Sequence, residues 1–318
     1  MELREEIRNY LIRKLGVEYD PKSEMIITVG GSEGIDIALR AMLDRDDEVL
    51  IPQPSYVSYE PCTILAGGKP VIIELKAEDG FKLKASQILE KVTDKTKILI
   101  LPFPNNPTGS ILNMDELREI AKVCIEKDLY VISDEIYCEL TYEGEHASIV
   151  QIEGMKERTV LINGFSKSYA MTGWRLGYAT GPKEIISQMT KIHQYAIMCA
   201  PTTSQYAAVE ALAHGDADVA RMRESYNQRR RYLLHRFEEL GMTCFEPQGA
   251  FYVFPSIKRF GMSSEEFATR LLEEQKIAIV PGTAFGECGE GYVRVSYAYS
   301  MERLKEALSR IEKFVRSL

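Results

Sequence analysis

The sequence predicts an α/β protein in which a mostly parallel, seven-stranded sheet forms a large domain and a smaller α+β domain follows. Short apolar segments alternate with longer segments of helical periodicity over the first two-thirds of the chain, a pattern typical of parallel sheets. The alternation ends near Pro201, where longer helical segments begin. A chain of 318 residues, 45% of them hydrophobic, is long enough for two unequal domains.

Seven short apolar segments predict the strands of the sheet. Helical spacing between strands is clear at Ile35, Leu39 and Met42. The last two strands are joined by a segment without helical periodicity, so we expect at least one strand there to run antiparallel. The predicted strands are residues 25–29, 48–51, 71–75, 98–101, 130–133, 160–162 and 176–179.

The second domain is predicted from the pattern after Pro201. Helices are expected at 203–213 and 216–240, and the second of these is expected to link the two domains. We therefore assign residues 1–214 to a large cofactor-binding domain and 215–318 to the interdomain helix and a small C-terminal domain. The elements expected in the small domain are strands 250–254, 277–280 and 292–296, helix 264–275 and a closing helix from Met301.

Composition argues against several classes of protein. The formal net charge is −8, and the one basic cluster, 229–231, lies among glutamates and is interpreted as a solvated helix face, so we expect no nucleic-acid binding. The six cysteines lie far apart without a CxxC pair, which indicates reduced core cysteines and no metal site. No apolar run has the length of a membrane span and the first residues are highly charged, so we expect a cytoplasmic protein without membrane contact.

Lys167 is the first candidate for chemistry. An apolar run from 160 breaks at Ser166 and Lys167, and Arg175 follows. A lysine at the end of a buried strand is paired, neutralised or used covalently. Schiff-base formation removes the charge that burial disfavours. Taken alone, Ser166 and Lys167 are more often found in a solvated loop.

Three other segments are expected at strand ends. Residues 29–34, rich in glycine, join a strand to a helix and can present backbone N–H groups to an anion, although a plain tight turn is the simpler interpretation of this segment alone. Residues 102–109 combine prolines with two asparagines. Asp134 and Glu135 end a buried strand, so Asp134 requires a cationic partner.

Arg294 interrupts a strand of the predicted small domain. Its planar guanidinium suits a carboxylate ligand, although a surface arginine on an edge strand is the simpler interpretation of this position alone. A nucleophilic lysine, an acid that needs a cation, an anion cradle and a carboxylate-binding arginine together are what pyridoxal phosphate and an amino acid substrate require.

The chain strongly resembles the class I and II aminotransferases of the aspartate aminotransferase superfamily, which have the pyridoxal-phosphate-dependent transferase fold of type I. The resemblance covers essentially the whole chain. It implies a homodimer that moves an amino group between an L-amino acid and a 2-oxo acid by a ping-pong mechanism in amino acid metabolism and biosynthesis. The motifs that carry it are 105–109, 133–137, 166–177 and 292–296, in the family's order.

The resemblance also implies roles for individual residues. Lys167 would form the Schiff base with the cofactor and later move the proton of the substrate. Asp134 would keep the ring nitrogen protonated. Asn106 and Tyr137 would donate to the phenolic oxygen, and Arg294, with Asn106, would hold the substrate carboxylate.

The remaining roles concern the phosphate and the ring. Arg175 would bind the phosphate, and Tyr56 matches the aromatic residue that stacks on the ring. Other cofactor contacts are expected from Gly31, Ser32 and Glu33, mainly through the backbone, and from Ser166.

Some positions differ from the family's pattern or stay open. Gly164 stands where many relatives have a phosphate-binding serine, and Trp174 is expected to pack in the core. Residues 193–198 and 251–252 are interpreted either as a side-chain pocket or as interface. Members of the family usually have several dozen residues before the helix expected at 2–15, which predicts an open site and weak cofactor binding.

Two alternative functions remain. A carbon–sulfur β-lyase would use the same lysine and cofactor. A non-catalytic protein that only binds the cofactor would retain the fold without the reaction.

Overall fold

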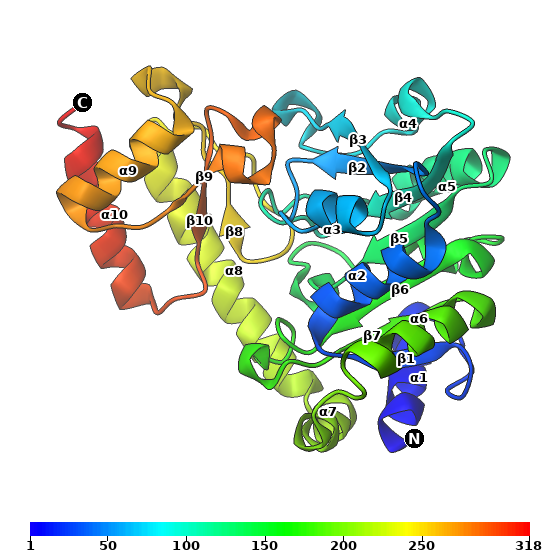
Figure 1. The fold of residues 1–318 in the computed structure, drawn as a ribbon. Helices are drawn as coiled ribbons and strands as arrows, with labels where there is room; N and C mark the ends of the chain where they lie inside the picture. Colours follow the sequence, from blue (N-terminus) through cyan, green and yellow to red (C-terminus); the bar gives the residue numbers. More distant parts are fainter.

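The computed structural model describes all 318 residues and contains the seven-stranded sheet that the sequence predicts (Figure 1). The strand order is β1-β7-β6-β5-β4-β2-β3. Strands β2 to β6 are parallel, whereas β7 runs antiparallel to both of its neighbours, β1 and β6, which confirms the expected antiparallel strand. The bounds are β1 (Met25–Thr28), β2 (Glu48–Gln53), β3 (Lys69–Glu74), β4 (Thr96–Leu101), β5 (Tyr130–Asp134), β6 (Thr159–Gly164) and β7 (Gly177–Thr180).

Helices cover both faces of this sheet, and alternate strand residues pack against each cover. In β4, Ile98 and Ile100 belong to one apolar core, while Leu99 and Leu101 belong to the other, as the two-residue period of a strand requires. The first core is covered by α2 (Gly30–Met42), α3 (Tyr59–Leu65) and α6 (Lys183–Ala196), and the second by α1 (Glu2–Leu15), α4 (Ala85–Lys91), α5 (Met114–Glu126) and α7 (Thr202–His214).

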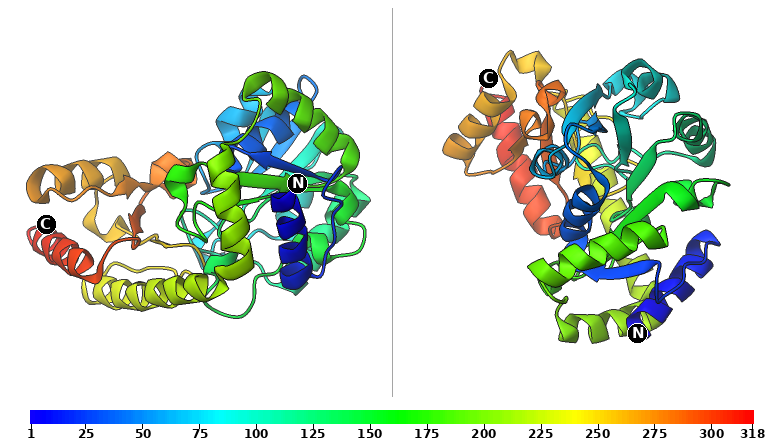
Figure 2. Two further views of the ribbon diagram at one scale, coloured as in Figure 1. Left: turned by 90° about the horizontal axis from the view of Figure 1, so that it is seen from below. Right: turned by 45° about the vertical axis from the view of Figure 1, so that its right-hand side comes forward.

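A second lobe stands to one side of the sheet and is reached by the long helix α8 (Asp216–Glu239), as the left view of Figure 2 shows. It has its own apolar core, which includes Phe267, Leu271 and Phe314. Its small antiparallel sheet has the order β8-β10-β9. The elements of this lobe are β8 (Tyr252–Val253), α9 (Ser264–Gln275), β9 (Val280–Pro281), β10 (Val293–Ser296) and α10 (Met301–Val315).

Arg230 corrects the interpretation of the basic cluster as a solvated face, because its side chain is only 2% exposed. It donates to the carbonyl oxygen of Pro247 at 2.7 Å and pairs with Glu143 and Glu246 at 3.2 Å each. Its guanidinium also lies 5.2 Å from the ring centroid of Tyr142. The side of α8 that carries Arg230 is therefore buried where the two lobes meet.

Backbone hydrogen bonds reinforce this junction. The N–H groups of Gln248 and Gly249 both donate to the carbonyl oxygen of Gly109, at 2.8 and 2.9 Å. Gly109 has φ +72°, and a Cβ there would lie 2.3 Å from Pro247 Cβ, so only glycine fits. The segment after α8 is thus tied to the loop that follows β4.

The six cysteines are free. Cys124 and Cys138 are buried, as expected, but Cys199 lies on the surface, so the prediction of core cysteines is wrong for it. No helix combines the length and the apolar character needed to span a membrane. No three histidine, cysteine or acidic side chains are grouped as metal ligands.

Candidate active site

A cavity of about 260 Å³ lies at the carboxyl ends of the parallel strands and reaches β8 and β10 of the second lobe. Ligands of open α/β sheets usually bind at this edge, because the loops there converge. The cavity brings together almost all of the residues expected from the sequence. Those that line it are Gly31, Ser32, Tyr56, Asn106, Asp134, Tyr137, Ser166, Lys167, Arg175 and Arg294.

The N-terminus of α2 and Arg175 form an anion cradle. Gly30 has φ +78°, and a Cβ on it would lie 2.5 Å from Nη2 of Arg175, so the guanidinium rests directly over the start of the helix. Arg175 donates only to the carbonyl oxygen of Thr172, at 2.9 Å, and has no carboxylate partner. Free N–H groups and an unpaired guanidinium at one point attract a doubly charged anion such as phosphate.

Glu33 is the expected residue that does not line the cavity. Its carboxylate accepts the N–H of Val29 at 2.5 Å and bonds to Nδ1 of His193 at 2.7 Å. The side chain therefore stabilises the first turn of α2 instead of facing a ligand.

Gly164 lies where β6 and β7 approach closely. A Cβ at this position would lie 2.9 Å from Gly177 Cα and 3.0 Å from the carbonyl oxygen of Leu176. A side chain here requires β7 to shift, so the anion cradle is built without one.

Asp134 is buried and has no cationic partner in the chain. Its oxygens accept the hydroxyl of Tyr59 at 2.7 Å and the N–H of Ile136 at 3.2 Å. Burial raises the pKa of Asp134 above its ordinary value in spite of these hydrogen bonds. A carboxylate so placed at the cavity is suited to a protonated ring nitrogen of a ligand.

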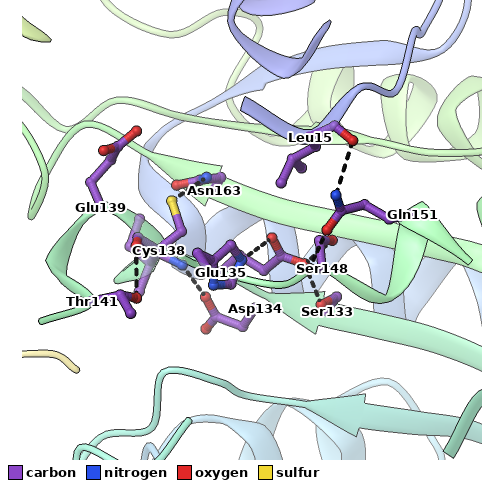
Figure 3. A network of polar contacts seen from close by, with 12 residues as sticks. Leu15, Ser133, Asp134, Glu135, Cys138, Glu139, Thr141, Ser148, Gln151 and Asn163 are labelled. Carbon is purple, nitrogen blue, oxygen red and sulfur yellow. Dashed lines mark hydrogen bonds and ion pairs between the residues drawn. The ribbon is translucent and has the colours of Figure 1, made fainter. Parts of the chain in front are cut away.

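The next residue, Glu135, holds the end of β5 from the opposite face (Figure 3). Its carboxylate accepts the hydroxyls of Ser133 at 2.8 Å and Ser148 at 2.6 Å, and contacts Nε2 of His146 at 2.7 Å. Successive strand residues point to opposite faces, so this network fixes the backbone that carries Asp134 without entering the cavity.

Lys167 follows β6 and has no ion pair. Its Nζ lies 5.8 Å from the ring centroid of Tyr137 and 5.4 Å from that of Phe251. Burial lowers the pKa of Lys167, and repulsion by Arg294 and Arg175 adds to this effect. The neutral amine, which is the nucleophilic form, is therefore favoured.

Arg294 lies on β10, the central strand of the small sheet, so the interpretation as an edge-strand surface arginine is wrong. Its Nη1 donates to Oδ1 of Asn106 at 2.9 Å. Its Nε is buried without a partner. A half-buried guanidinium whose Nε is a buried and unused donor is suited to a carboxylate ligand.

Several lining residues were not predicted as site residues. Tyr59, three residues after Tyr56 at the start of α3, is the most important, because it is the only side chain that donates to Asp134. The only feature of the sequence that could have indicated this role is the position of Tyr59 three residues after Tyr56. The other unpredicted lining residues are Ile35, Pro102, Pro104, Ile136 and Thr172, and Tyr252 was expected only as a pocket alternative.

Trp174 and residues 193–198 lie outside the cavity. The prediction that Trp174 packs in the core is wrong, because its side chain is 48% exposed. Arg175, the next residue, adopts a left-handed conformation, with φ 51°. Tyr195 and Met198 are 92% and 79% exposed, so they lie on the surface and not in this cavity.

Comparisons with known proteins agree with this geometry. Residues 1–311 match the family model described as Aminotransferase class I and II. A Bacillus subtilis (strain 168) protein named YugH, assigned as an aminotransferase, is 50% identical over 98% of this chain and 81% of its own length. The aspartate aminotransferase of Pyrococcus abyssi is 46% identical over 99% and 82%. The crystal structure of an aromatic aminotransferase from Pyrococcus horikoshii OT3 superposes with a TM-score of 0.97, at 45% identity, over 99% of this chain and 85% of its own.

The chain therefore belongs to the class I and II aminotransferases, which are pyridoxal-phosphate-dependent enzymes of fold type I. The residues present fit this cofactor, because an anion cradle, a buried carboxylate without an ion pair and a lysine of lowered pKa surround one cavity. Neither the lyase nor the non-catalytic alternative is favoured by the comparisons.

Proposed function

We propose that this aminotransferase takes the amino group of an L-amino acid, passes it to a 2-oxo acid, and carries out both half-reactions with the residues of the single cavity described above. The observation that carries the proposal is the charge of that cavity. Lys167, Arg175 and Arg294 face it with Asp134 as the only carboxylate. An excess of positive charge without protein partners favours a ligand with a phosphate and a substrate with a carboxylate.

The cofactor-binding roles follow from the positions of the residues. Arg175 and the N–H groups of Gly31 and Ser32 bind the phosphate. Asp134, held by Tyr59, keeps a proton on the ring nitrogen. When bound, pyridoxal phosphate supplies an aldehyde that accepts the amino group and a ring that withdraws electrons from Cα of the substrate.

The remaining cofactor contacts involve the ring and its phenolic oxygen. Asn106 and Tyr137 donate hydrogen bonds to that oxygen, while Tyr56 covers the ring. Ser166 also lines the cavity. Its carbonyl oxygen already accepts the hydroxyl of Thr172 at 2.8 Å, so its own hydroxyl is the group left to contact the cofactor.

Substrate roles fall to Lys167 and Arg294. Arg294 and Asn106 bind the α-carboxylate and so orient the amino acid. Burial and the two arginines lower the pKa of Lys167, so its amine loses its proton more readily than an ordinary lysine. It can then act as a nucleophile and can take up and return the proton at Cα of the substrate.

We also propose a homodimer in the cytoplasm, in which the domain of residues 1–214 holds the cofactor and that of 215–318 closes over the substrate. Tyr195, Met198 and Tyr206 are 92%, 79% and 67% exposed, and Arg175 is exposed beside the cavity. Exposed aromatic and methionine side chains are typical of interfaces. Light scattering after size exclusion is expected to give twice the mass of the 36.1 kDa chain.

The decisive experiment uses the purified protein with pyridoxal phosphate and single L-amino acids, including aspartate, phenylalanine and tyrosine, without a 2-oxo acid. We expect a visible absorption band that depends on Lys167 and that one or more amino acids abolish, with one equivalent of the matching 2-oxo acid released per site. A bound cofactor that no amino acid changes would overturn the proposal. Release of ammonia and pyruvate from cysteine conjugates would instead support the lyase.

A further inference from the structure

We propose that Tyr252 is a positioning residue that joins the carboxylate site at Arg294 to the hydroxyl of Tyr137. Through its ring it fixes the guanidinium, and through its hydroxyl it strengthens the hydrogen bond that Tyr137 gives to the cofactor. The inference rests on the function proposed above and assigns a task to a side chain that has no role there.

The contact with Tyr137 is a hydrogen bond between two buried hydroxyls. The oxygens lie 3.0 Å apart and either can donate, and the rings meet edge to face at 5.9 Å. If Tyr137 donates its proton to the phenolic oxygen of the cofactor, its own oxygen is left to accept the proton of Tyr252. Hydrogen bonds arranged in such a chain strengthen one another, so Tyr252 makes Tyr137 the better donor.

The contact with Arg294 is made by the face of the ring. Cζ of Arg294 lies 4.4 Å from the ring centroid of Tyr252 and 4.8 Å from that of Phe285, well within the range of cation–π attraction. The bond to Asn106 fixes one end of the guanidinium. Two rings and one amide thus hold Arg294 with its Nε unused, before any substrate is present.

The surroundings of Tyr252 leave its hydroxyl no other task. The side chain lines the cavity, and its hydroxyl bonds only to Tyr137. The charged and titratable groups near it are Arg294, Tyr137, Tyr56 and Tyr226. None of these is a carboxylate that would compete for the proton of Tyr252, so its hydroxyl is free to donate to Tyr137 once Tyr137 donates to the cofactor.

Two substitutions separate the two contacts. Tyr252→Phe removes the hydroxyl and keeps the ring over Arg294, while Tyr252→Leu removes both. Phe285→Leu is the matched control, because it removes a ring from Arg294 without touching Tyr137. Thermal unfolding of each variant tests whether the fold is retained. If Tyr252→Leu does not fold, Tyr252→Phe alone tests the role of the Tyr252 hydroxyl.

The first readout needs no substrate. It is the pH at which the visible spectrum of protein-bound pyridoxal phosphate changes. A hydrogen bond to the phenolate favours the deprotonated form, so losing the support of Tyr252 raises this spectroscopic pKa. We expect a rise of roughly half to one pH unit in both Tyr252 variants and none in Phe285→Leu.

The second readout is KM for the amino acid identified above, measured where all proteins have the cofactor in the same protonation state. We expect KM within about twofold of wild type in Tyr252→Phe and roughly fivefold higher in Tyr252→Leu and Phe285→Leu. An unchanged spectroscopic pKa in Tyr252→Phe, with a reactive wild type, overturns this inference alone. A wild type that does not bind pyridoxal phosphate overturns the proposed function and this inference together.

Discussion

At the scale of single residues, the site is built at a cost to the stability of the protein without its cofactor. The pKa of Asp134 is raised by burial, and that of Lys167 is lowered by burial and by two arginines. Both shifts mean that the ionised forms are disfavoured in the folded chain. Bound cofactor relieves this strain, because it brings the charges that these side chains lack.

Asp134→Asn is expected to stabilise the protein without cofactor at pH 7 by about 1 kcal/mol. Because the pKa of Asp134 is raised in the folded chain, protonation of Asp134 favours the folded state. This contribution to stability is fully present below the ordinary pKa of 3.8 and is lost as the pH rises through the pKa of the folded state. The gain from the substitution therefore grows with pH and fades in acid. Urea unfolding between pH 4 and 8 measures it, and a variant less stable than wild type at pH 7 contradicts it.

Lys167→Met is expected to show the opposite dependence on pH. Because the pKa of Lys167 is lowered, its charged form costs stability at neutral pH, and this cost disappears as pH approaches the ordinary value of 10.5. The gain in unfolding free energy is again about 1 kcal/mol at pH 7 but shrinks in alkali. Asp134 partly offsets the effect by attraction, so the double variant should show non-additivity. A gain that is independent of pH would indicate improved packing instead.

What the sequence predicts at this scale depends on how conspicuous a residue is. Lys167, Asp134 and Arg294 stand out because charges are rare in apolar strands. Tyr59 does not, because a tyrosine at a helix start is as consistent with packing as with a hydrogen bond to a buried carboxylate. The exposure of Trp174 was mispredicted because it depends on one left-handed turn at Arg175.

At the scale of elements, the alternation of strands and helices predicted the sheet well because most strands are apolar and buried on both faces. Only the edge strand β3 is largely half-buried or exposed. Strands β8 and β9 contain two residues each, whereas longer strands were predicted. The residues beside them in the sequence are also apolar, because they pack in the core of the second lobe. The burial of Arg230 was missed because it depends on which residues of the two lobes pack against α8. The periodicity of a single helix gives no information about those residues.

The start of α2 offers a prediction with a matched control. Gly30→Ala and Gly67→Ala both place a side chain at positive φ, +78° and +86°, but only the first meets Arg175. Each should lose about 1 kcal/mol of unfolding free energy. Only Gly30→Ala should also weaken pyridoxal phosphate binding, by tenfold or more, in an equilibrium titration followed by absorption. Equal affinities in the two variants would show that Arg175 does not depend on the helix start.

At the scale of the whole molecule, Arg230 joins the lobes. Arg230→Met should lower the unfolding free energy by roughly 2–3 kcal/mol, since it leaves the carbonyl of Pro247 without its donor and opens the space below Tyr142. Limited proteolysis should then cut sooner between residues 240 and 250. Arg231→Met, on the exposed side of α8, is the control and should change stability by less than about 0.5 kcal/mol. Equal rates of proteolysis in the two variants would argue against a role of Arg230 in holding the two lobes together.

The position of β1 has a consequence for synthesis on the ribosome. β1 pairs with β7 alone, and the helix start that cradles the anion packs on Gly177, whose Cβ would lie 2.7 Å from the carbonyl carbon of Gly30. During synthesis, β1 therefore lacks its partner strand until residues 177–180 have been made. Such distant pairing slows folding and leaves an unpaired edge exposed meanwhile. The anion cradle at the start of α2 is thus completed only after Arg175 and Gly177 have been synthesised.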